Sequence, residues 1–311
     1  MSSPIGSGYR VGRFEVAGLI GAGGMGAVYR ALDTRSGEVV ALKVLHGLSG
    51  AIGSQAYGRF RREVHALGRL RHENIVSLRS SLEEEQHLCY YAMEHVDGAD
   101  LGRVLRSRGR LGIREAAATG VFVLRALDAA HETGVIHRDI KPQNVLLGTN
   151  GALEVADFGI ARMLESTGFT GTGQMPGTPT YMAPEQADGK RADARSDVYS
   201  VGVLLYRLIA GQPPFEAESA LAILRMHVEK EPRPLADMAA ETPRPLAEVV
   251  HRALSKAPAD RYQSAQEMLD ELLRTGLVSS DREAPVSTPG PRPRLEWSRP
   301  RPPTGNPARR Q

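Results

Sequence analysis

The hydrophobic pattern of the chain changes its period near residue 98, and this change restricts the fold more than any other feature. Before it, β-forming residues gather in three short runs that are separated by glycine and Ser-Gly turns: residues 14–20, 27–33 and 39–45. Runs of this kind predict antiparallel strands. After residue 98, apolar residues recur at helical spacing. We therefore expect an α+β chain in which a small, mostly β lobe precedes a larger, mostly α lobe.

A polar run, IHRDIKPQN at 136–144, interrupts the helical part of the chain between two apolar segments. Polar groups in such a place must bond to one another or to a ligand. Downstream, Gly211 followed by two prolines is a typical helix stop. The other elements are expected at these positions: helices near 57–70, 113–132 and 197–210, and strands at 87–96, 145–147 and 153–156.

The number of cysteines and the lengths of the apolar stretches indicate in which cellular compartment the protein works. The single cysteine, Cys89, lies in an apolar run, which excludes a disulfide framework and favours a buried thiol in a reducing compartment. The first ten residues contain no apolar signal segment, and no apolar stretch approaches the roughly 20 residues of a membrane span. The sequence predicts a cytoplasmic protein without a membrane span.

The positive charge of the chain is concentrated at its C-terminal end. Residues 282–311 hold seven Arg and two Glu, and since the whole chain is +3, the residues before them sum to −2. Nucleic-acid binding by the body of the protein is therefore not indicated. We divide the chain into an N-terminal extension (1–13), a folded domain (14–274) and a Pro- and Arg-rich tail (275–311) that is expected to be disordered.

The first candidate site is GAGGMGAV, from Gly21 to Val28. Repeated glycines at a strand end let backbone N–H groups approach phosphates closely. A dinucleotide site requires a helix directly after the glycines, whereas the residues that follow here resemble a strand. The pattern favours a flap between two strands, with a plain hairpin turn as the alternative.

Two charged residues lie on faces that are otherwise apolar. Lys43 ends the apolar strand VALK, and Glu63 lies between Phe60 and Leu67 on the inward face of the first helix. A buried carboxylate requires a partner, and Lys43 is the obvious cation. The alternative for Lys43 alone is an ammonium group that reaches the surface.

Oxygen ligands for a cation follow in the polar run and after it. Asp139 and Asn144 are five residues apart, and Asp157 begins the triplet Asp-Phe-Gly. Carboxylate and amide oxygens near a phosphate cradle suit Mg²⁺. A structural Asx turn explains any one of these residues, but not all three together with the glycine flap and the Lys–Glu pair.

The ordered set GAGGMGAV, VALK, Glu63, HRDIKPQN, DFG and APE (183–185) resembles the signature series of protein kinases over about residues 14–274. The likeness is strongest to the bacterial branch of eukaryotic-like serine/threonine kinases. It implies a two-lobed protein-kinase-like fold, with an N-lobe at about 14–95 and a C-lobe at about 97–274. The implied activity is transfer of the γ-phosphoryl group of Mg·ATP, with Mn²⁺ as an alternative metal, to Ser or Thr hydroxyls of proteins.

The resemblance also implies roles for individual residues. Asp139 would accept the proton of the substrate hydroxyl, with Lys141 beside the γ-phosphate, and Asn144 and Asp157 would hold the metal. Lys43, held by Glu63, would bind the α and β phosphates. The residues implied to contact ATP are Ile20, Gly21, Ala22, Gly23, Gly24, Met25, Gly26, Ala27, Val28, Ala41, Lys43, Met93, Glu94, Val96, Leu146 and Asp157.

Further residues would support or regulate this site. By resemblance, Asp197 braces the polar run, Glu185 pairs with Arg261, and Thr178 bonds Asp139. Autophosphorylation is expected at Thr170, Thr172 or both, and Arg138 and Arg162 would receive the phosphate by bidentate bonds. The alternative is that these threonines only keep the loop soluble.

Two functions remain open. The first is an active kinase acting on protein substrates, with a kinase–kinase dimer for autophosphorylation as a conceivable partner. The second is a catalytically weak kinase-fold scaffold that acts through its tail. No catalytic position departs from the family pattern, which favours the first.

Overall fold

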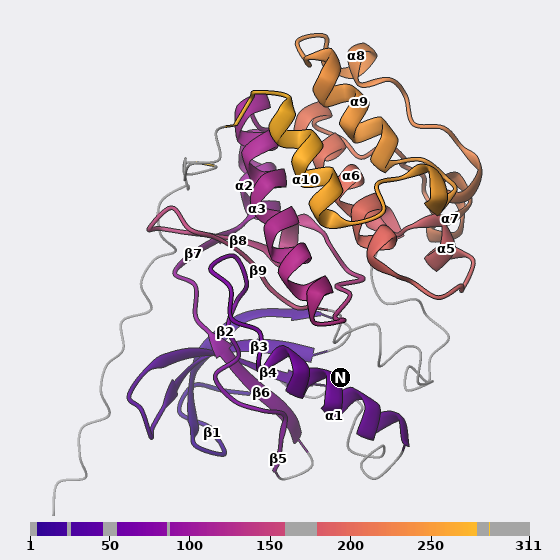
Figure 1. Cartoon of the computed structure of the whole chain (residues 1–311). Coiled ribbons are helices and arrows are strands. Elements are labelled where there is room, and N and C mark those ends of the chain that lie inside the picture. Colours follow the sequence, from indigo (N-terminus) through magenta and orange to yellow (C-terminus); the bar gives the residue numbers. More distant parts are fainter. Residues whose placement is uncertain are drawn as a thin grey trace, which may run out of the picture.

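The computed structural model of the chain describes residues 5–23, 26–45, 55–85, 88–158, 179–278 and 286. It has two lobes: in Figure 1 a sheet with one helix lies below and a group of helices lies above. The predicted α+β class with a small β lobe and a larger α lobe is confirmed.

The N-lobe is an antiparallel six-stranded sheet in the order β1-β2-β3-β4-β6-β5. Its strands are β1 (Arg10–Val11), β2 (Phe14–Gly23), β3 (Gly26–Asp33), β4 (Val39–Leu45), β5 (Glu83–Glu85) and β6 (Leu88–Glu94), and its helix is α1 (Gln55–Leu67). The three runs expected as strands form β2, β3 and β4, and the run at 87–96 forms β6. Strands β1 and β5 were not predicted from the sequence; both are short and lie at the edges of the sheet.

The two faces of this sheet serve different cores, because successive side chains of a strand point to opposite sides. On β6, Tyr90 belongs to a small cluster within the N-lobe, together with Phe14 and Leu42. Tyr91 and Met93 point the other way, into the main hydrophobic cluster of the protein. That cluster continues into the helices of the C-lobe, so one core joins the two lobes.

The C-lobe combines a three-stranded antiparallel sheet, in the order β7-β8-β9, with a group of helices. The strands are β7 (Gly98–Asp100), β8 (Val145–Gly148) and β9 (Leu153–Val155). The helices are α2 (Leu101–Arg108), α3 (Ile113–Glu132), α5 (Pro184–Ala187), α6 (Ala194–Ala210), α7 (Ala220–Glu229), α8 (Leu235–Met238), α9 (Arg244–Ala253) and α10 (Ala265–Arg274). In Figure 1, α3 runs beside α10 from the top of the C-lobe down toward the N-lobe.

Helix α6 shows how local sequence sets an element's limits. Asp193 caps its first turn by accepting a hydrogen bond from the N–H of Arg195, so the helix begins three residues before the expected 197. It ends at Gly211, whose φ of 79° is left-handed, as the glycine stop predicts. Almost every side chain between these caps is buried, which makes α6 the central helix of the C-lobe.

The start of the predicted tail packs against the C-lobe. Val278 is 8% exposed and Val286 is 5% exposed, and both belong to the main hydrophobic cluster. Arg114 on α3 donates a hydrogen bond to the carbonyl of Leu277 at 3.0 Å. The described positions of the predicted tail thus include two buried apolar side chains, which pack against the C-lobe. Within the described ranges, no helix is long and apolar enough to cross a membrane.

Candidate active site

Lys43 and Asp157 meet where the N-lobe sheet faces the C-lobe. The Lys43 ammonium lies 2.6 Å from Oδ1 of Asp157, and the Lys43 side chain is 9% exposed. Burial is the largest single influence and raises the pKa of Asp157. The charge of Lys43, its hydrogen bond and the smaller effects of His137 and Lys141 together outweigh burial and hold the pKa below its usual range. The carboxylate is therefore charged at neutral pH.

The expected partner of Lys43 was Glu63, which lies within α1. The side chain of Glu63 falls outside the described part of the structure, so that pair stays a prediction. An ammonium group has three N–H donors, and the bond to Asp157 leaves room for a second carboxylate.

The polar run places three candidate catalytic side chains in contact. Nζ of Lys141 lies 2.6 Å from Oδ2 of Asp139. The side-chain nitrogen of Asn144 donates to the carbonyl of Asp139 at 2.7 Å and to its Oδ2 at 3.1 Å. Since these bonds use its nitrogen, Asn144 has its amide oxygen to offer to a cation.

A short helical turn ties this run to Asp157. Residues Pro142–Asn144 form a 3-10 turn, in which the ring of the first residue fixes the backbone. The carbonyl of Asn144 then accepts a hydrogen bond from the N–H of Ala156 at 2.8 Å. The two oxygen ligands expected for the metal, at 144 and 157, are thus carried by segments that are bonded directly to each other.

This donor set fits Mg²⁺. One carboxylate and one amide oxygen are few ligands, but Mg²⁺ is usually held in this way, with phosphate oxygens and water completing its shell. Within the described residues there is no cluster of three His, Cys, Asp or Glu side chains that would hold a metal on its own. The residues therefore suit a metal that arrives with a nucleotide.

Asp197, at the start of α6, fixes the backbone of the polar run from behind. Its side chain is fully buried and accepts hydrogen bonds from the N–H groups of His137 at 2.8 Å and Arg138 at 2.7 Å. A third bond, at 2.8 Å, joins it to Nε2 of His131 on α3. Arg138 has a left-handed φ of 64°, which is rare for a residue with a side chain. The carboxylate therefore holds a backbone turn that would otherwise be unfavourable.

His137 is a bracing side chain in a defined tautomer. Its Nδ1 accepts a hydrogen bond from the N–H of Asp139 at 3.2 Å, so Nε2 carries the proton and donates it to the carbonyl of Ala156 at 3.1 Å. Burial lowers the pKa of His137, although Asp197 opposes the effect. The ring also packs on Phe158, with 4.5 Å between centroids. A neutral imidazole thus joins the polar run to the segment around Asp157.

The residues expected around the adenine ring lie on both sides of the junction between the lobes. Ile20 and Val28 on the N-lobe sheet, and Val96 and Leu146 beyond it, are partly buried against the main cluster, while Ala41 and Met93 belong to it. Glu94 uses its N–H to bond the carbonyl of Ser77 at 2.8 Å, so this N–H is not available to a ligand.

The glycine flap is described on both sides of its tip. Gly21, Ala22 and Gly23 are exposed at the end of β2, and Gly26 and Ala27 begin β3. A Cβ at Gly26 would collide with the carbonyl oxygen of Val44, so only glycine fits there. Gly24 and Met25 fall outside the described residues.

The regulatory prediction concerns residues that the structure does not describe. Thr170, Thr172, Thr178 and Arg162 all lie in the undescribed range 159–178. Arg138 is described, and its carbonyl accepts a hydrogen bond from the Gln186 side chain at 3.4 Å. The phosphorylation switch stays a prediction.

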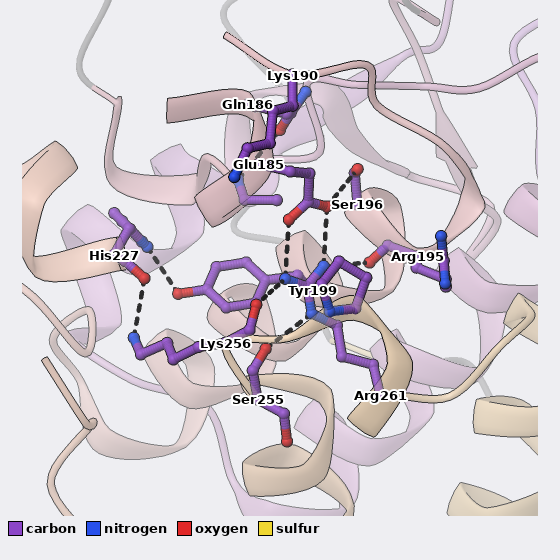
Figure 2. Close-up of polar contacts among 12 residues, drawn as sticks. Glu185, Gln186, Lys190, Arg195, Ser196, Tyr199, His227, Ser255, Lys256 and Arg261 are labelled. Atoms are coloured by element: carbon purple, nitrogen blue, oxygen red, sulfur yellow. Dashed lines mark hydrogen bonds and ion pairs between the residues drawn. The ribbon is translucent and has the colours of Figure 1, made fainter. Parts of the chain in front are cut away.

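Glu185 and Arg261, paired by resemblance, form a buried ion pair in the C-lobe (Figure 2). Arg261 is fully buried and bonds both oxygens of Glu185, at 2.9 and 2.8 Å. The other N–H groups of Arg261 bond the backbone carbonyls of Arg195, Ser255 and Lys256 at 2.8–3.0 Å. The guanidinium group therefore uses all its donors. Hydrogen bonds from Arg261 and from Ser196 hold the pKa of Glu185 below its usual range, against the opposing effect of burial.

Residues around this pair were missed by the sequence analysis. Arg261 stacks on the ring of Tyr199, with 4.8 Å from Cζ to the ring centroid. The Tyr199 hydroxyl bonds Nδ1 of His227 at 2.9 Å, and Figure 2 shows Lys256 reaching the carbonyl of His227. Each comes from a different segment, so no local pattern marks them.

Two other polar groups near the site were also missed: His131 behind Asp197, and the hydroxyl of Tyr91 in β6. The position of Tyr91 in β6 could have identified it as a residue near the site. It pairs with Lys43 in the strand register and therefore lies on the same face of the sheet.

Comparison with known proteins agrees with this geometry. Residues 14–273 match the protein kinase domain family. Serine/threonine-protein kinase PknB of Mycolicibacterium smegmatis is 41% identical over 267 residues, which is 84% of this chain and 43% of that protein. PksC of Streptomyces coelicolor, another serine/threonine-protein kinase, is 42% identical over 89% of this chain and 51% of its own length. This chain thus spans about half the length of the curated relatives it matches.

A solved structure gives the same result for the fold. The crystal structure of the PknI kinase domain of Mycobacterium tuberculosis superimposes with a TM-score of 0.70 at 30% identity, covering 88% of this chain and 99% of that one. With the sheet, the helical lobe and the polar run arranged as described, the chain belongs to the protein kinase family.

Proposed function

We propose that this chain is a protein serine/threonine kinase that transfers the γ-phosphoryl group of Mg·ATP to protein hydroxyls. One observation carries the proposal: Lys141 and Asn144 both bond Asp139, and the Asn144 carbonyl is bonded to the residue before Asp157. The candidate base, the cation beside it and the two candidate metal ligands are thus held by segments that are hydrogen-bonded to each other. Phosphoryl transfer depends mainly on such positioning and on neutralisation of charge.

In this mechanism Asp139 accepts the proton of the substrate hydroxyl as the oxygen–phosphorus bond forms. The bond between the γ-phosphorus and the bridging oxygen breaks, and ADP leaves. Lys43 and Lys141 supply positive charge to the phosphates. Their bonds to Asp157 and Asp139 are the contacts that a nucleotide would share or replace. Mg²⁺, held by Asp157 and Asn144, would neutralise charge on the phosphate oxygens.

The nucleotide would lie under the glycine flap between the lobes. The proposed contacts are the residues named in the sequence analysis from Ile20 to Val28, with Ala41, Met93, Glu94, Val96 and Leu146. Mg²⁺ is favoured over Mn²⁺ by its abundance in cells alone, since the oxygen donors suit both metals.

Regulation would act through the segment between Asp157 and Glu185. Phosphate on Thr170 or Thr172 would add about 1.5–2 negative charges beside Arg138 and Arg162. Thr178 would bond Asp139 and select Ser or Thr substrates. A second copy of the chain is a natural substrate, since one molecule can phosphorylate another.

We also propose that the domain works in the cytoplasm, where ATP and reducing conditions coexist. Its only cysteine, Cys89, is a buried free thiol, which suits that compartment. The alternative of a catalytically weak scaffold is not favoured, because Lys43, Asp139, Asn144 and Asp157 are all present. Asn144 bonds Asp139, and Lys43 bonds Asp157.

The test is incubation of purified protein with Mg·ATP and a generic protein substrate, followed by mapping of phosphorylated sites. Phosphoserine and phosphothreonine in the substrate, with phosphate on Thr170 or Thr172, are the expected result. An Asp139→Asn variant is the matched control, because it keeps the size of the side chain and removes the base. Equal phosphorylation by both proteins would contradict the mechanism, and phosphate on tyrosine alone would contradict the substrate class.

A further inference from the structure

A small, partly open cavity lies beside Asp157, and none of its lining residues comes from the polar run. Its volume is about 20 Å³, and its walls include Leu67 from α1, Met93 and Tyr91 from β6, and the consecutive residues Asp157 and Phe158. A water molecule requires roughly 10–15 Å³ of such space. The cavity therefore has room for one water molecule.

Tyr91 supplies an unpaired polar atom to this cavity. The residue is 1% exposed, and its hydroxyl group is buried without a hydrogen-bond partner. Tyr91 and Asp157 both line the cavity, so the phenol and the carboxylate are neighbours there. Burial raises the pKa of Tyr91 well above its usual range, and the charge of Asp157 and its side-chain contact with the phenol add to the effect. Buried hydroxyl groups without partners are rare in folded proteins, and an ordered water commonly explains one.

The strand register explains why these groups meet. Tyr91 lies opposite Lys43 in the antiparallel pair of β4 and β6, so both side chains project from the same face of the sheet toward the C-lobe. Lys43 reaches Oδ1 of Asp157 at 2.6 Å. Tyr91 lines the same cavity as Asp157, so both residues of one cross-strand pair lie beside Asp157.

We propose that the cavity holds one water molecule, which accepts a hydrogen bond from the Tyr91 hydroxyl and donates one to the Asp157 carboxylate. Two polar partners meet the minimum for a buried water. Tyr91 is then a positioning residue: through the water it fixes the carboxylate that holds the metal. The metal role of Asp157 rests on the proposed function, whereas the water itself does not.

The substitution that isolates this role is Tyr91→Phe, which keeps the ring and removes the hydroxyl. The readout is binding of a fluorescent ADP analogue to the full chain, titrated with Mg²⁺ and repeated in EDTA. One hydrogen bond is worth about a two- to tenfold change in an equilibrium constant. We expect the Mg²⁺ concentration for half-maximal tightening to rise by about that factor, with unchanged nucleotide affinity in EDTA.

The neighbouring residue provides the control. Tyr90 is equally buried but lies on the opposite face of the sheet, where its hydroxyl is 3.4 Å from Glu83 and Glu85. Tyr90→Phe should leave the Mg²⁺ titration unchanged. An unchanged titration for Tyr91→Phe, or an equal shift for Tyr90→Phe, would overturn the positioning role.

A crystal structure of the wild-type protein at high resolution tests the water independently of either variant's folding. Density for a water within hydrogen-bond distance of both the Tyr91 hydroxyl and Asp157 supports the proposal. A dry cavity, or a phenol bonded directly to Asp157, overturns it. If wild-type nucleotide binding does not respond to Mg²⁺ at all, the proposed function fails, and the positioning role falls with it while the water remains testable.

Discussion

The buried pair of Glu185 and Arg261 allows the sharpest prediction about stability. Glu185→Leu removes both acceptors of the two charged hydrogen bonds and leaves a cation in a site where Arg261 is fully buried. Arg261→Met removes the cation and leaves three backbone carbonyls and the carboxylate without it. The double variant leaves no uncompensated charge.

The magnitudes follow from the contacts. Hydrogen bonds to a charged group contribute about 1.5–3 kcal/mol each, so loss of two of them predicts a destabilisation of about 3–6 kcal/mol. This agrees with the 3–5 kcal/mol or so that is typical when one partner of a buried pair is removed. The double variant should be more stable than the sum of the two losses predicts, by about 2–3 kcal/mol.

The assay is urea denaturation at pH 7, with nucleotide absent, for the wild type, both single variants and the double variant. Arg110→Met is the control, because Arg110 and Glu241 form an ion pair of similar length that is about half exposed on both sides. It should leave the denaturation midpoint unchanged. A loss below about 1 kcal/mol for Glu185→Leu, or strictly additive losses, would refute the reasoning that burial makes this pair interdependent.

Three further outcomes are expected. Asp139→Asn should lower kcat by about 100-fold or more, because a general base acts only in the transition state. Nucleotide affinity, measured by titration, should stay the same. A loss of nucleotide affinity of similar size would assign Asp139 to nucleotide binding. Truncation after Thr275 should lower the free energy of unfolding by about 2–5 kcal/mol, because Val278 and Val286 are buried. Truncation after Ser287 keeps both valines and should not lower it. Equal stability of the two truncated proteins would contradict the packing of these valines on the C-lobe. Burial and then the charge of Lys256 lower the pKa of His227 from 6.5 to about 4. The stability that this group contributes is therefore present above pH 6.5 and is lost as the pH falls through 4. His227→Gln should flatten this part of the curve of unfolding free energy against pH, measured by denaturation, and an unchanged curve would contradict the assignment.

Local patterns predicted the main elements of the fold because those elements are defined locally. The strands β2, β3 and β4 carry β-formers between glycine turns, and α6 ends at a glycine followed by prolines. Strand β5 was missed because Glu83–Glu85 consists of three glutamates, which are poor strand formers. It forms a strand because it pairs with the edge of β6. This pairing depends on the folded sheet and cannot be read from the local sequence.

The site was predictable in composition but not in its contacts. The polar run predicted that its side chains bond one another. In the structure, Lys141 and Asn144 both bond Asp139. The bond of Lys43 to Asp157 joins residues 114 positions apart. Sequence reasoning could place both at the site, but not decide which carboxylate the ammonium would contact. The same limit applies to Tyr91, whose importance depends on a cavity that exists only after the lobes pack.

The left-handed backbone at Arg138, with its counterpart at Asp157 (φ 59°), has a consequence for protein engineering. Such conformations cost about 1–3 kcal/mol for each residue with a side chain, and glycine adopts them without strain. A laboratory selection for heat resistance alone should therefore favour glycine at position 138, whereas a selection for catalysis should reject it. At position 157 glycine would also leave the buried Lys43 ammonium without its carboxylate, and this loss offsets the gain. The segments that meet at the site are where thermal tolerance and turnover make opposite demands on the same residues.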